Sequence, residues 1–178
     1  MKTLILILFP LGFVGCFAPV ADNPLNIINI RYNENLKTGE EAEEASKVSF
    51  YNDGFRNVFT DRSSGGGQFW ILQDTGTKSR YRIRNKVTGE YLVASQDMKD
   101  PLRRRVYTWT GNTPVAHALI EQEWDLIEEE DGFVIKNVKF GEYLYAAADE
   151  FAFDENNRSV FTWKNYDDLG REGYWKFE

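Results

Sequence analysis

The stretch Ile83-Arg84-Asn85, followed by Gly89-Glu90-Tyr91-Leu92, decides the fold because the chain contains it twice. It recurs as Ile135-Lys136-Asn137 followed by Gly141-Glu142-Tyr143-Leu144, with each residue displaced by 52 positions. Self-similarity at a fixed period of this size is typical of proteins that are built from repeated structural units. A match of this length indicates two copies of one unit rather than coincidence.

The two copies remain similar downstream of this stretch. Val106-Tyr107-Thr108-Trp109 is matched by Val160-Phe161-Thr162-Trp163, and Trp124-Asp125-Leu126 is matched by Trp175-Lys176-Phe177. A third, more divergent copy lies upstream, and its segments are Ile27-Ile28-Asn29, Glu34-Asn35-Leu36, Val58-Phe59-Thr60-Asp61 and Trp70-Ile71-Leu72. The sequence therefore predicts three copies, at about residues 25–75, 79–130 and 131–178, each with four short apolar segments.

The apolar segments alternate with a period of two, as half-buried β-strands do. Leu36, Leu92 and Leu144 are each followed two residues later by a small side chain, which places a large and a small residue on one inward face. The apolar members of the alternating faces are therefore predicted core residues. They include Ile27, Ile83, Ile135, Trp70, Leu72, Trp124, Leu126, Trp175 and Phe177.

One segment of the first copy does not follow this pattern. Gly39 to Ser46 is rich in Glu and Ala and occupies an insertion that the other two copies lack. Its residues are good helix formers, but the segment is short and strongly charged. We expect a solvated loop or a single turn here.

Three copies of four strands, each closed by a Trp, resemble the β-trefoil, a six-stranded barrel that is capped by three hairpins around a pseudo-threefold axis. The resemblance covers residues 25 to 178 and implies an all-β fold with one domain at residues 22–178. Gln68-Phe69-Trp70 and Gln122-Glu123-Trp124 are similar to the Gln-x-Trp signature of ricin-type lectin trefoils, which bind galactose-class sugars. The third copy departs from this signature with Gly173-Tyr174-Trp175.

The resemblance to ricin-type lectins implies a core role for the Trp and a role for the Gln in orienting the sugar-site loop. That family's direct sugar ligands are an early Asp, a stacking aromatic residue and an Asn in one repeat. This sequence shows no clear version of that set, and the family's usual disulfides are missing. The motif therefore indicates the fold more than it indicates a sugar.

A second resemblance concerns the third copy. Asn137 to Leu144 and Arg158 to Phe161 are similar to an Asn-x-x-Tyr-x-x-Tyr-Leu stretch and a following Arg-x-Val-Tyr stretch in the trefoil module of the thirty-kilodalton haemolymph lipoproteins of moths, with Phe140 in place of the first Tyr. That family's N-terminal helical domain has no counterpart here, so its lipid-related roles are not implied. Arg56, Arg104 and Arg158 recur in all copies, and we predict that each pairs structurally with a carboxylate or a carbonyl.

The composition excludes several classes of function. The 178 residues are 42% hydrophobic and 15% aromatic, which is enough for a buried core. A net charge of −7 argues against nucleic-acid binding. With one Cys and one His, cysteine-rich zinc sites and disulfide scaffolds are excluded. Nothing in the sequence nominates a catalytic partner for His117, so we predict no enzyme activity, no cofactor and no metal.

The N-terminus reads as a secretory signal. Lys2 is followed by an apolar run that ends at Gly15, and small residues beyond it offer cleavage points between residues 17 and 22. We predict a signal peptide at residues 1–21 and a secreted, extracellular, disulfide-free mature chain. The alternative is a bacterial lipobox at Val14-Gly15-Cys16, in which Cys16 would be lipidated.

Residues that break the threefold pattern are the best binding candidates, because packing symmetry does not require them. Trp109 and Trp163 stand where the first copy has Asp61, and Tyr145 stands where the others have Val93 and Lys37. An exposed Trp or Tyr stacks well on a sugar or anchors a protein interface. The alternative is that both Trp side chains fill the hairpin cap.

Acidic residues of the third copy complete the candidate set. Asp149-Glu150 and Asp154-Glu155-Asn156-Asn157 gather oxygen ligands as a calcium site would, although their spacing does not match an EF-hand loop. We predict a solvated acidic turn, with Asp149 and Asp154 available to a ligand and no metal. Asn157-Arg158-Ser159 is a glycosylation sequon, which makes Asn157 a candidate modification site.

Together these features predict a secreted, monomeric, non-enzymatic binding protein that recognises an extracellular carbohydrate or protein, in particular a glycan or glycoprotein, without nucleic-acid binding or membrane insertion. One alternative is a structural or storage protein of an extracellular fluid. Another is a protein inhibitor that inserts the Gly111 to Ile120 loop, which contains Pro114 and His117, into an enzyme's cleft.

Overall fold

The computed structural model describes residues 23–41, 55–110, 120–152 and 154–178. They form twelve β-strands and two short 3-10 helices, and Ile120 and Glu121 are helical. The strands are β1 (Leu25–Asn29), β2 (Glu34–Glu41), β3 (Arg56–Asp61), β4 (Phe69–Asp74), β5 (Arg80–Asn85), β6 (Tyr91–Met98), β7 (Arg103–Trp109), β8 (Glu123–Glu129), β9 (Gly132–Asn137), β10 (Tyr143–Phe151), β11 (Arg158–Trp163) and β12 (Tyr174–Phe177); the 3-10 helices are η2 (Tyr166–Asp168) and η3 (Arg171–Gly173). The predicted all-β class is confirmed.

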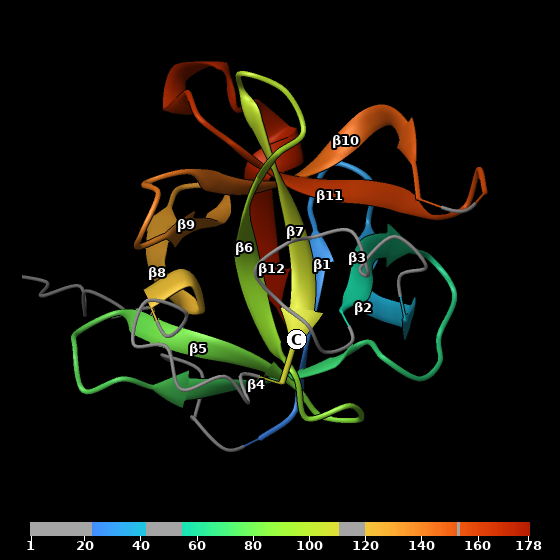
Figure 1. Ribbon diagram of the computed structural model, residues 1–178, viewed down its shortest axis with the longest axis horizontal. Coiled ribbons are helices and arrows are strands. Elements are labelled where there is room, and N and C mark those ends of the chain that lie inside the picture. Colours follow the sequence, from blue (N-terminus) through green and yellow to red (C-terminus); the bar gives the residue numbers. More distant parts are fainter. Residues whose placement is uncertain (1–22, 42–54, 111–119, 153) are drawn as a thin grey trace, which may run out of the picture.

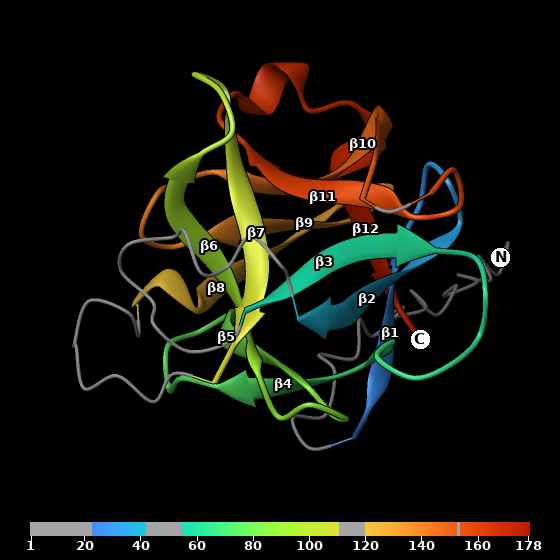
Figure 2. The same cartoon turned by 45° about the vertical axis from the view of Figure 1, so that its right-hand side comes forward.

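Six of the strands close into a ring of antiparallel pairs. The order is β1, β12, β9, β8, β5 and β4, and β4 pairs again with β1. This ring brings the first and last strands together, with Ile27 opposite Phe177. β1 in blue and β12 in red accordingly lie side by side in Figure 1 and Figure 2. The described chain is therefore closed into one barrel.

The other six strands form three hairpins, which we call the first (β2–β3), second (β6–β7) and third (β10–β11) hairpins. Their outer strands pair with one another, β3 with β7, β7 with β11 and β11 with β3. Each hairpin also carries one register irregularity, after Thr38, Ala94 and Ala146 respectively. The three hairpins are therefore bound to each other as well as to the barrel.

The barrel encloses the predicted core. Ile27, Ile83, Ile135 and the three leucines of the hairpins are fully buried, and Phe177 packs against them from a partly buried position. Three buried tryptophans donate their indole N–H to the carbonyls of those leucines: Trp70 to Leu36 at 2.8 Å, Trp124 to Leu92 at 3.0 Å and Trp175 to Leu144 at 2.9 Å. A buried indole needs such an acceptor, so these bonds fix each Trp against one hairpin.

Asn29, Asn85 and Asn137 anchor the turns that lead into the hairpins. Each amide is fully buried, and its oxygen accepts backbone N–H groups of the following turn. Their amide nitrogens donate to the carbonyls of Glu172 (2.7 Å), Gly67 (2.8 Å) and Glu121 (2.9 Å), each three residues before one of the buried tryptophans. The turns contain Asn33, Gly89 and Gly141 at φ of 53°, 74° and 67°, a conformation that Gly and Asn tolerate best.

Buried carboxylates connect the hairpins to one another. Glu34, Glu90 and Glu142 stand at the starts of the three hairpins and are at most 4% exposed. Each forms an ion pair with the arginine of another hairpin: Arg56 with Glu90 at 2.9 Å, Arg104 with Glu142 at 3.0 Å and Arg158 with Glu34 at 3.2 Å. Each also accepts a buried threonine hydroxyl, from Thr60, Thr108 and Thr162 at 2.7, 2.6 and 2.5 Å. The predicted structural role of the three arginines is confirmed.

The aromatic residue of the Asn-x-x-aromatic motif also has a structural role. The Arg104 guanidinium lies 3.6 Å from the ring centroid of Phe140, and that of Arg158 lies 3.8 Å from the ring of Tyr32. Such cation–π contacts hold the guanidinium plane in place for its carboxylate partner. The residues that resemble the moth haemolymph module are thus explained by packing and pairing.

Several predictions fall partly or wholly outside the described residues. These are the signal peptide with Cys16, and the loop that contains Pro114 and His117. The predicted loop at Gly39 to Ser46 is corrected at its start, because β2 continues through residue 41 by pairing with β3. In the described part of the chain, no helix is both long and apolar enough to cross a bilayer.

Candidate functional site

Each hairpin has one equivalent pair of residues, one on each strand, whose chemistry differs among the three hairpins. We call the place of this pair the variable position. In the first hairpin the pair is Lys37 and Asp61. Lys37 is 5% exposed, and its ammonium group lies 2.9 Å from the Asp61 carboxylate and 2.8 Å from the Ser63 hydroxyl. This partly buried ion pair uses the hydrogen-bonding capacity of both side chains locally. It makes the first hairpin a closed polar arrangement.

The second hairpin holds Val93 and Trp109 at the same position. Val93 is fully buried, and Trp109 is 1% exposed within an apolar cluster that includes Phe55 and Tyr107. The rings of Phe55 and Trp109 are stacked at a centroid distance of 6.2 Å. The prediction that Trp109 binds a ligand is therefore wrong, because a side chain buried against Phe55 cannot stack on a ligand. The alternative prediction, that the Trp side chain fills the hairpin cap, holds for Trp109.

The third hairpin holds Tyr145 and Trp163, and here the position opens onto a pocket. The two rings meet edge to face, with centroids 5.3 Å apart and planes at 65°. They line a pocket of about 490 Å³ together with Asp149, so the structure brings three of the predicted site residues together. We call it the third-hairpin pocket, and its charged lining residues are Arg103, Asp149, Glu150, Asp168 and Glu172. Its volume is in the range of small-ligand sites.

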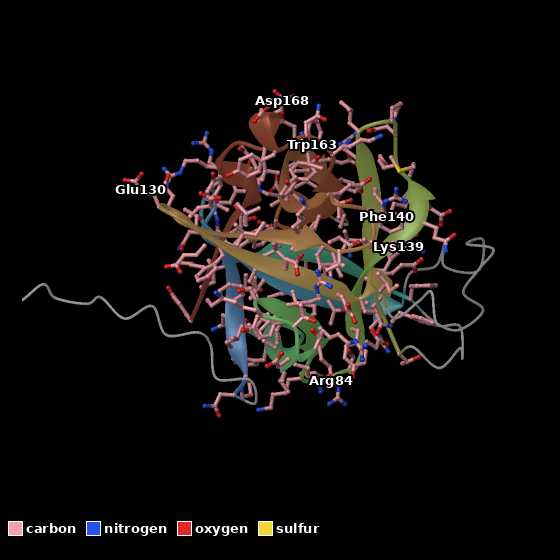
Figure 3. The ribbon with its side chains drawn as sticks, turned by 90° about the vertical axis from the view of Figure 1, so that its left-hand side faces the viewer. Arg84, Glu130, Lys139, Phe140, Trp163 and Asp168 are labelled. Atoms are coloured by element: carbon pink, nitrogen blue, oxygen red, sulfur yellow. The ribbon has the colours of Figure 1, made fainter. Side chains whose placement is uncertain are left out.

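Trp163 presents carbon to the solvent rather than its polar group. The residue is half-buried, but its Nε1 atom is buried and has no hydrogen-bond acceptor among the residues that the structure describes. What remains accessible of the indole is therefore its apolar surface. Figure 3 shows Trp163 at the same end of the molecule as Asp168, far from Arg84 at the other end.

The segment between β11 and β12 forms one wall of the pocket. Leu169 follows η2, is 4% exposed and lines the pocket. A Cβ atom at Gly173 would lie only 2.2 Å from Leu169 Cγ, which is far inside the contact distance of two carbons. This explains why the third copy has Gly173 where the other two copies have Gln68 and Gln122. The departure from the Gln-x-Trp pattern makes room for a wall of the pocket.

Arg103 holds the base of the pocket through a charge network. Its guanidinium binds Asp100 at 2.5 Å and Glu150 at 2.9 Å, and the other Glu150 oxygen binds Lys99 at 2.5 Å. Burial alone would raise the pKa of Glu150, but hydrogen bonds from Lys99 and Arg103 and attraction to both cations outweigh it and hold this pKa below its usual value. Two cations and two carboxylates thus balance within the network.

Tyr145 is held in its neutral form. Burial raises the pKa of its phenol, and the nearby Glu150 and Asp100 charges raise it further, against the lowering effect of a hydrogen bond with Arg103. The phenol therefore remains protonated at neutral pH. Tyr145 contributes a ring and a neutral hydroxyl group to the pocket, not a charge.

Asp154 and Asn157 lie elsewhere, in a second pocket of about 540 Å³ at the turn of the third hairpin. Asp154 Oδ1 accepts the Asn156 N–H at 2.8 Å and the Asn157 side-chain amide at 2.7 Å. Glu34 and Arg158 also line this pocket. The candidate glycosylation site at Asn157 therefore belongs to a polar turn and is separate from the aromatic pair.

The two acidic clusters do not combine into a cation site in the described structure. Asp149 and Glu150 line the third-hairpin pocket, whereas Asp154 and Asn157 line the other pocket. Within residues 23–41, 55–110, 120–152 and 154–178, no group of three or more His, Cys, Asp or Glu side chains is placed to hold a metal ion.

Sequence reasoning missed several contributors to the third-hairpin pocket, among them Arg103, Asp168, Leu169 and Glu172. Asp168, Leu169 and Glu172 lie in an irregular segment between β11 and β12 that has no periodicity to interpret. One signal was available. The replacement of Gln by Gly173 marks the place where the third copy differs from the others.

Comparison with known proteins finds similarity in structure and not in sequence. No protein-family model matches the chain, and no curated protein matches it. A Culex quinquefasciatus salivary protein of the Cysteine and Tryptophan-Rich (CWRC) family is 21% identical, with a TM-score of 0.64 over 89% of this chain and 96% of that one. A designed threefold-symmetric protein, ThreeFoil, is 17% identical, with a TM-score of 0.63 over 86% of this chain and 96% of that one.

A lectin from Polyporus squamosus is similar as well. It is 16% identical, with a TM-score of 0.60 over 89% of this chain, and this chain spans about half of it, 49%. That structure contains the lectin bound to the epitope Neu5Acα2-6Galβ1-4GlcNAc. At these identities the likeness concerns the fold alone. The neighbours and the barrel with its hairpins define a β-trefoil-like protein.

Proposed function

We propose that this protein is a secreted, non-enzymatic binding protein that recognises a glycan in the third-hairpin pocket. The observation that carries the proposal is the half-buried Tyr145–Trp163 pair, which is accompanied by carboxylates in one pocket. An apolar aromatic surface accepts the C–H face of a sugar ring, and carboxylate oxygens accept hydrogen bonds from its hydroxyl groups. The equivalent positions in the other two hairpins do not offer this combination, since the first holds the Lys37–Asp61 ion pair and the second holds the buried Trp109.

We infer further that the three copies form a pseudo-threefold trefoil of four strands each. The inference is supported by the equivalent bonds of the three tryptophans, the three turn asparagines and the three Arg–Glu–Thr groups. In this arrangement the third-hairpin pocket is one of three related positions, of which one has diverged into a site.

A glycan array followed by calorimetric titration tests the proposed function. The variant Trp163→Ala should weaken binding by at least about tenfold, because it removes the accessible aromatic surface. Phe69→Ala is the matched control: Phe69 is 39% exposed on β4, which Figure 1 and Figure 2 place at the opposite end from β10. The control should bind as the wild type does. Equal weakening in both variants, or silence across the array, contradicts the proposal.

Secretion and assembly are tested separately. N-terminal sequencing of the protein recovered from the medium of expressing cells should give a start between residues 17 and 22. A start at a lipid-modified Cys16, or retention inside the cell, contradicts the secretory proposal. Sedimentation of the mature protein should give a monomer, and a stable dimer would contradict it.

A further inference from the structure

The carboxylates of the third-hairpin pocket exceed the cations that balance them. Arg103 is the cation that lines it, and both Arg103 and the neighbouring Lys99 are bonded to Glu150, with Asp100 as the second carboxylate of that network. This group is neutral as a whole. The net charge of the pocket therefore depends on its remaining lining carboxylates.

Those remaining carboxylates are Asp149, Asp168 and Glu172. Asp149 and Asp168 are exposed, and neither has a Lys or Arg partner within 4.0 Å in the described part of the chain. Asp168 accepts a long hydrogen bond, 3.3 Å, from the Asn165 amide. Glu172 lies 3.8 Å from Arg31 Nε, a loose contact that involves a side chain 56% exposed. The rim of the pocket is therefore negative.

An aromatic pair beside a negative rim favours one kind of ligand group. A protonated amine gains charge-assisted hydrogen bonds from carboxylates and attraction from the faces of Trp and Tyr rings. A neutral acetamide at the same place loses the charge, and an acidic sugar is repelled. The surplus of lining carboxylates thus discriminates among sugars that the aromatic pair alone would accept equally.

Resting on the proposed function, we propose that the third-hairpin pocket selects an amino sugar with a free ammonium group, with Asp149 and Asp168 as the residues that bind the ammonium and Tyr145 and Trp163 as the surface for the sugar ring. This deepens the glycan proposal by naming the ligand class. It also separates this site from recognition of a sialylated epitope, which carries a carboxylate of its own.

The test compares glucosamine trimer with its fully N-acetylated counterpart, which differ only in the amine, by calorimetric titration of the mature protein. We expect the acetylated trimer to bind at least about tenfold more weakly. Asp168→Asn and Asp149→Asn should each weaken the glucosamine trimer several-fold and leave the acetylated trimer unchanged. Glu130→Gln is the control, because it removes one exposed carboxylate outside the pocket, at the side of the molecule in Figure 3.

The outcomes separate this proposal from the proposed function. If both trimers bind equally and Trp163→Ala weakens both, the glycan site stands and the amine selectivity is wrong. If the glucosamine trimer binds Trp163→Ala as tightly as the wild type, the attraction is to the net charge and not to the pocket, which overturns the proposal. Equal affinity for cyclohexylamine would show that an amine and not an amino sugar is recognised. If no saccharide binds, the proposed function itself fails.

Discussion

The second and third hairpins share one scaffold and differ at one position. Both begin with a buried glutamate that accepts an arginine and a threonine. At the variable position the second hairpin has a buried tryptophan whose ring stacks on Phe55, and the third has a tryptophan that lines a pocket. The residues that repeat are thus those that hold the hairpins together, and the binding candidates are found where the repetition stops.

The largest expected effect comes from breaking what the two hairpins share. Glu90→Ala and Glu142→Ala should each lower the free energy of unfolding by about 3–5 kcal/mol, because each leaves an arginine and a threonine without their buried acceptor. Urea denaturation measures this, with Glu130→Gln as the exposed control. If only one of the two variants lowers the unfolding free energy, the two glutamates do not contribute equally to stability, and the comparison of the two hairpins fails.

The next prediction breaks the difference between the two tryptophans. Trp109→Ala removes a buried ring and should cost about 3–5 kcal/mol of unfolding free energy. Trp163→Ala removes a half-buried ring and should cost less than about half of that, while it weakens glycan binding by at least about tenfold. Paired urea titrations and calorimetry check both variants. Equal destabilisation would mean that Trp163 is a core residue and that its exposure has no functional meaning.

Gly173→Ala sharpens the comparison by closing the third hairpin's pocket. The added methyl group meets Leu169, which must move, and overpacking of this kind costs about 1–3 kcal/mol. Because Leu169 is a wall of the pocket, ligand affinity should fall with stability. Gly66→Ala is the control for the glycine-to-alanine change, because an added Cβ there meets nothing within 4 Å and, as at Gly173, the φ of Gly66 lies outside the left-handed region. Unchanged binding in Gly173→Ala would show that Leu169 is not part of the site.

The scaffold could be predicted from the sequence because its residues repeat. The period-two alternation located strands and core, and the recurrence of Arg56, Arg104 and Arg158 identified a structural role, although not the partner. The partner glutamates also recur, at Glu34 and within both Gly-Glu-Tyr-Leu segments. That recurrence was the available signal. When an ion pair connects different hairpins in every copy, both of its partners recur in the sequence, here an arginine and a glutamate.

The site could be predicted only in part. Tyr145 and Trp163 were found because they break the pattern, Asp149 was found because it belongs to a cluster of acidic residues, and the pattern rule also selected Trp109. The rule does not distinguish an open position from a sealed one, because the residue that covers Trp109 is Phe55, which precedes β3 and is distant in sequence. Burial by a long-range neighbour is a tertiary property that local alternation does not contain.

The smallest expected effect is a pH dependence that separates the third hairpin from the second, whose Val93 and Trp109 do not titrate. Since the pKa of Glu150 is lowered in the folded protein, its ion pairs stabilise the fold above the unfolded pKa of about 4.3, and this contribution is lost as the pH falls through the folded pKa. Glu150→Gln should therefore make the unfolding free energy less dependent on pH below about pH 4, by less than about 1 kcal/mol because the pair is partly exposed.

Urea titrations between pH 3 and pH 7 compare this variant with Glu130→Gln, which removes an exposed carboxylate outside the network. If both variants follow the wild-type pH profile, the Lys99–Glu150–Arg103 network contributes nothing to the fold, and its role is confined to the charge of the pocket.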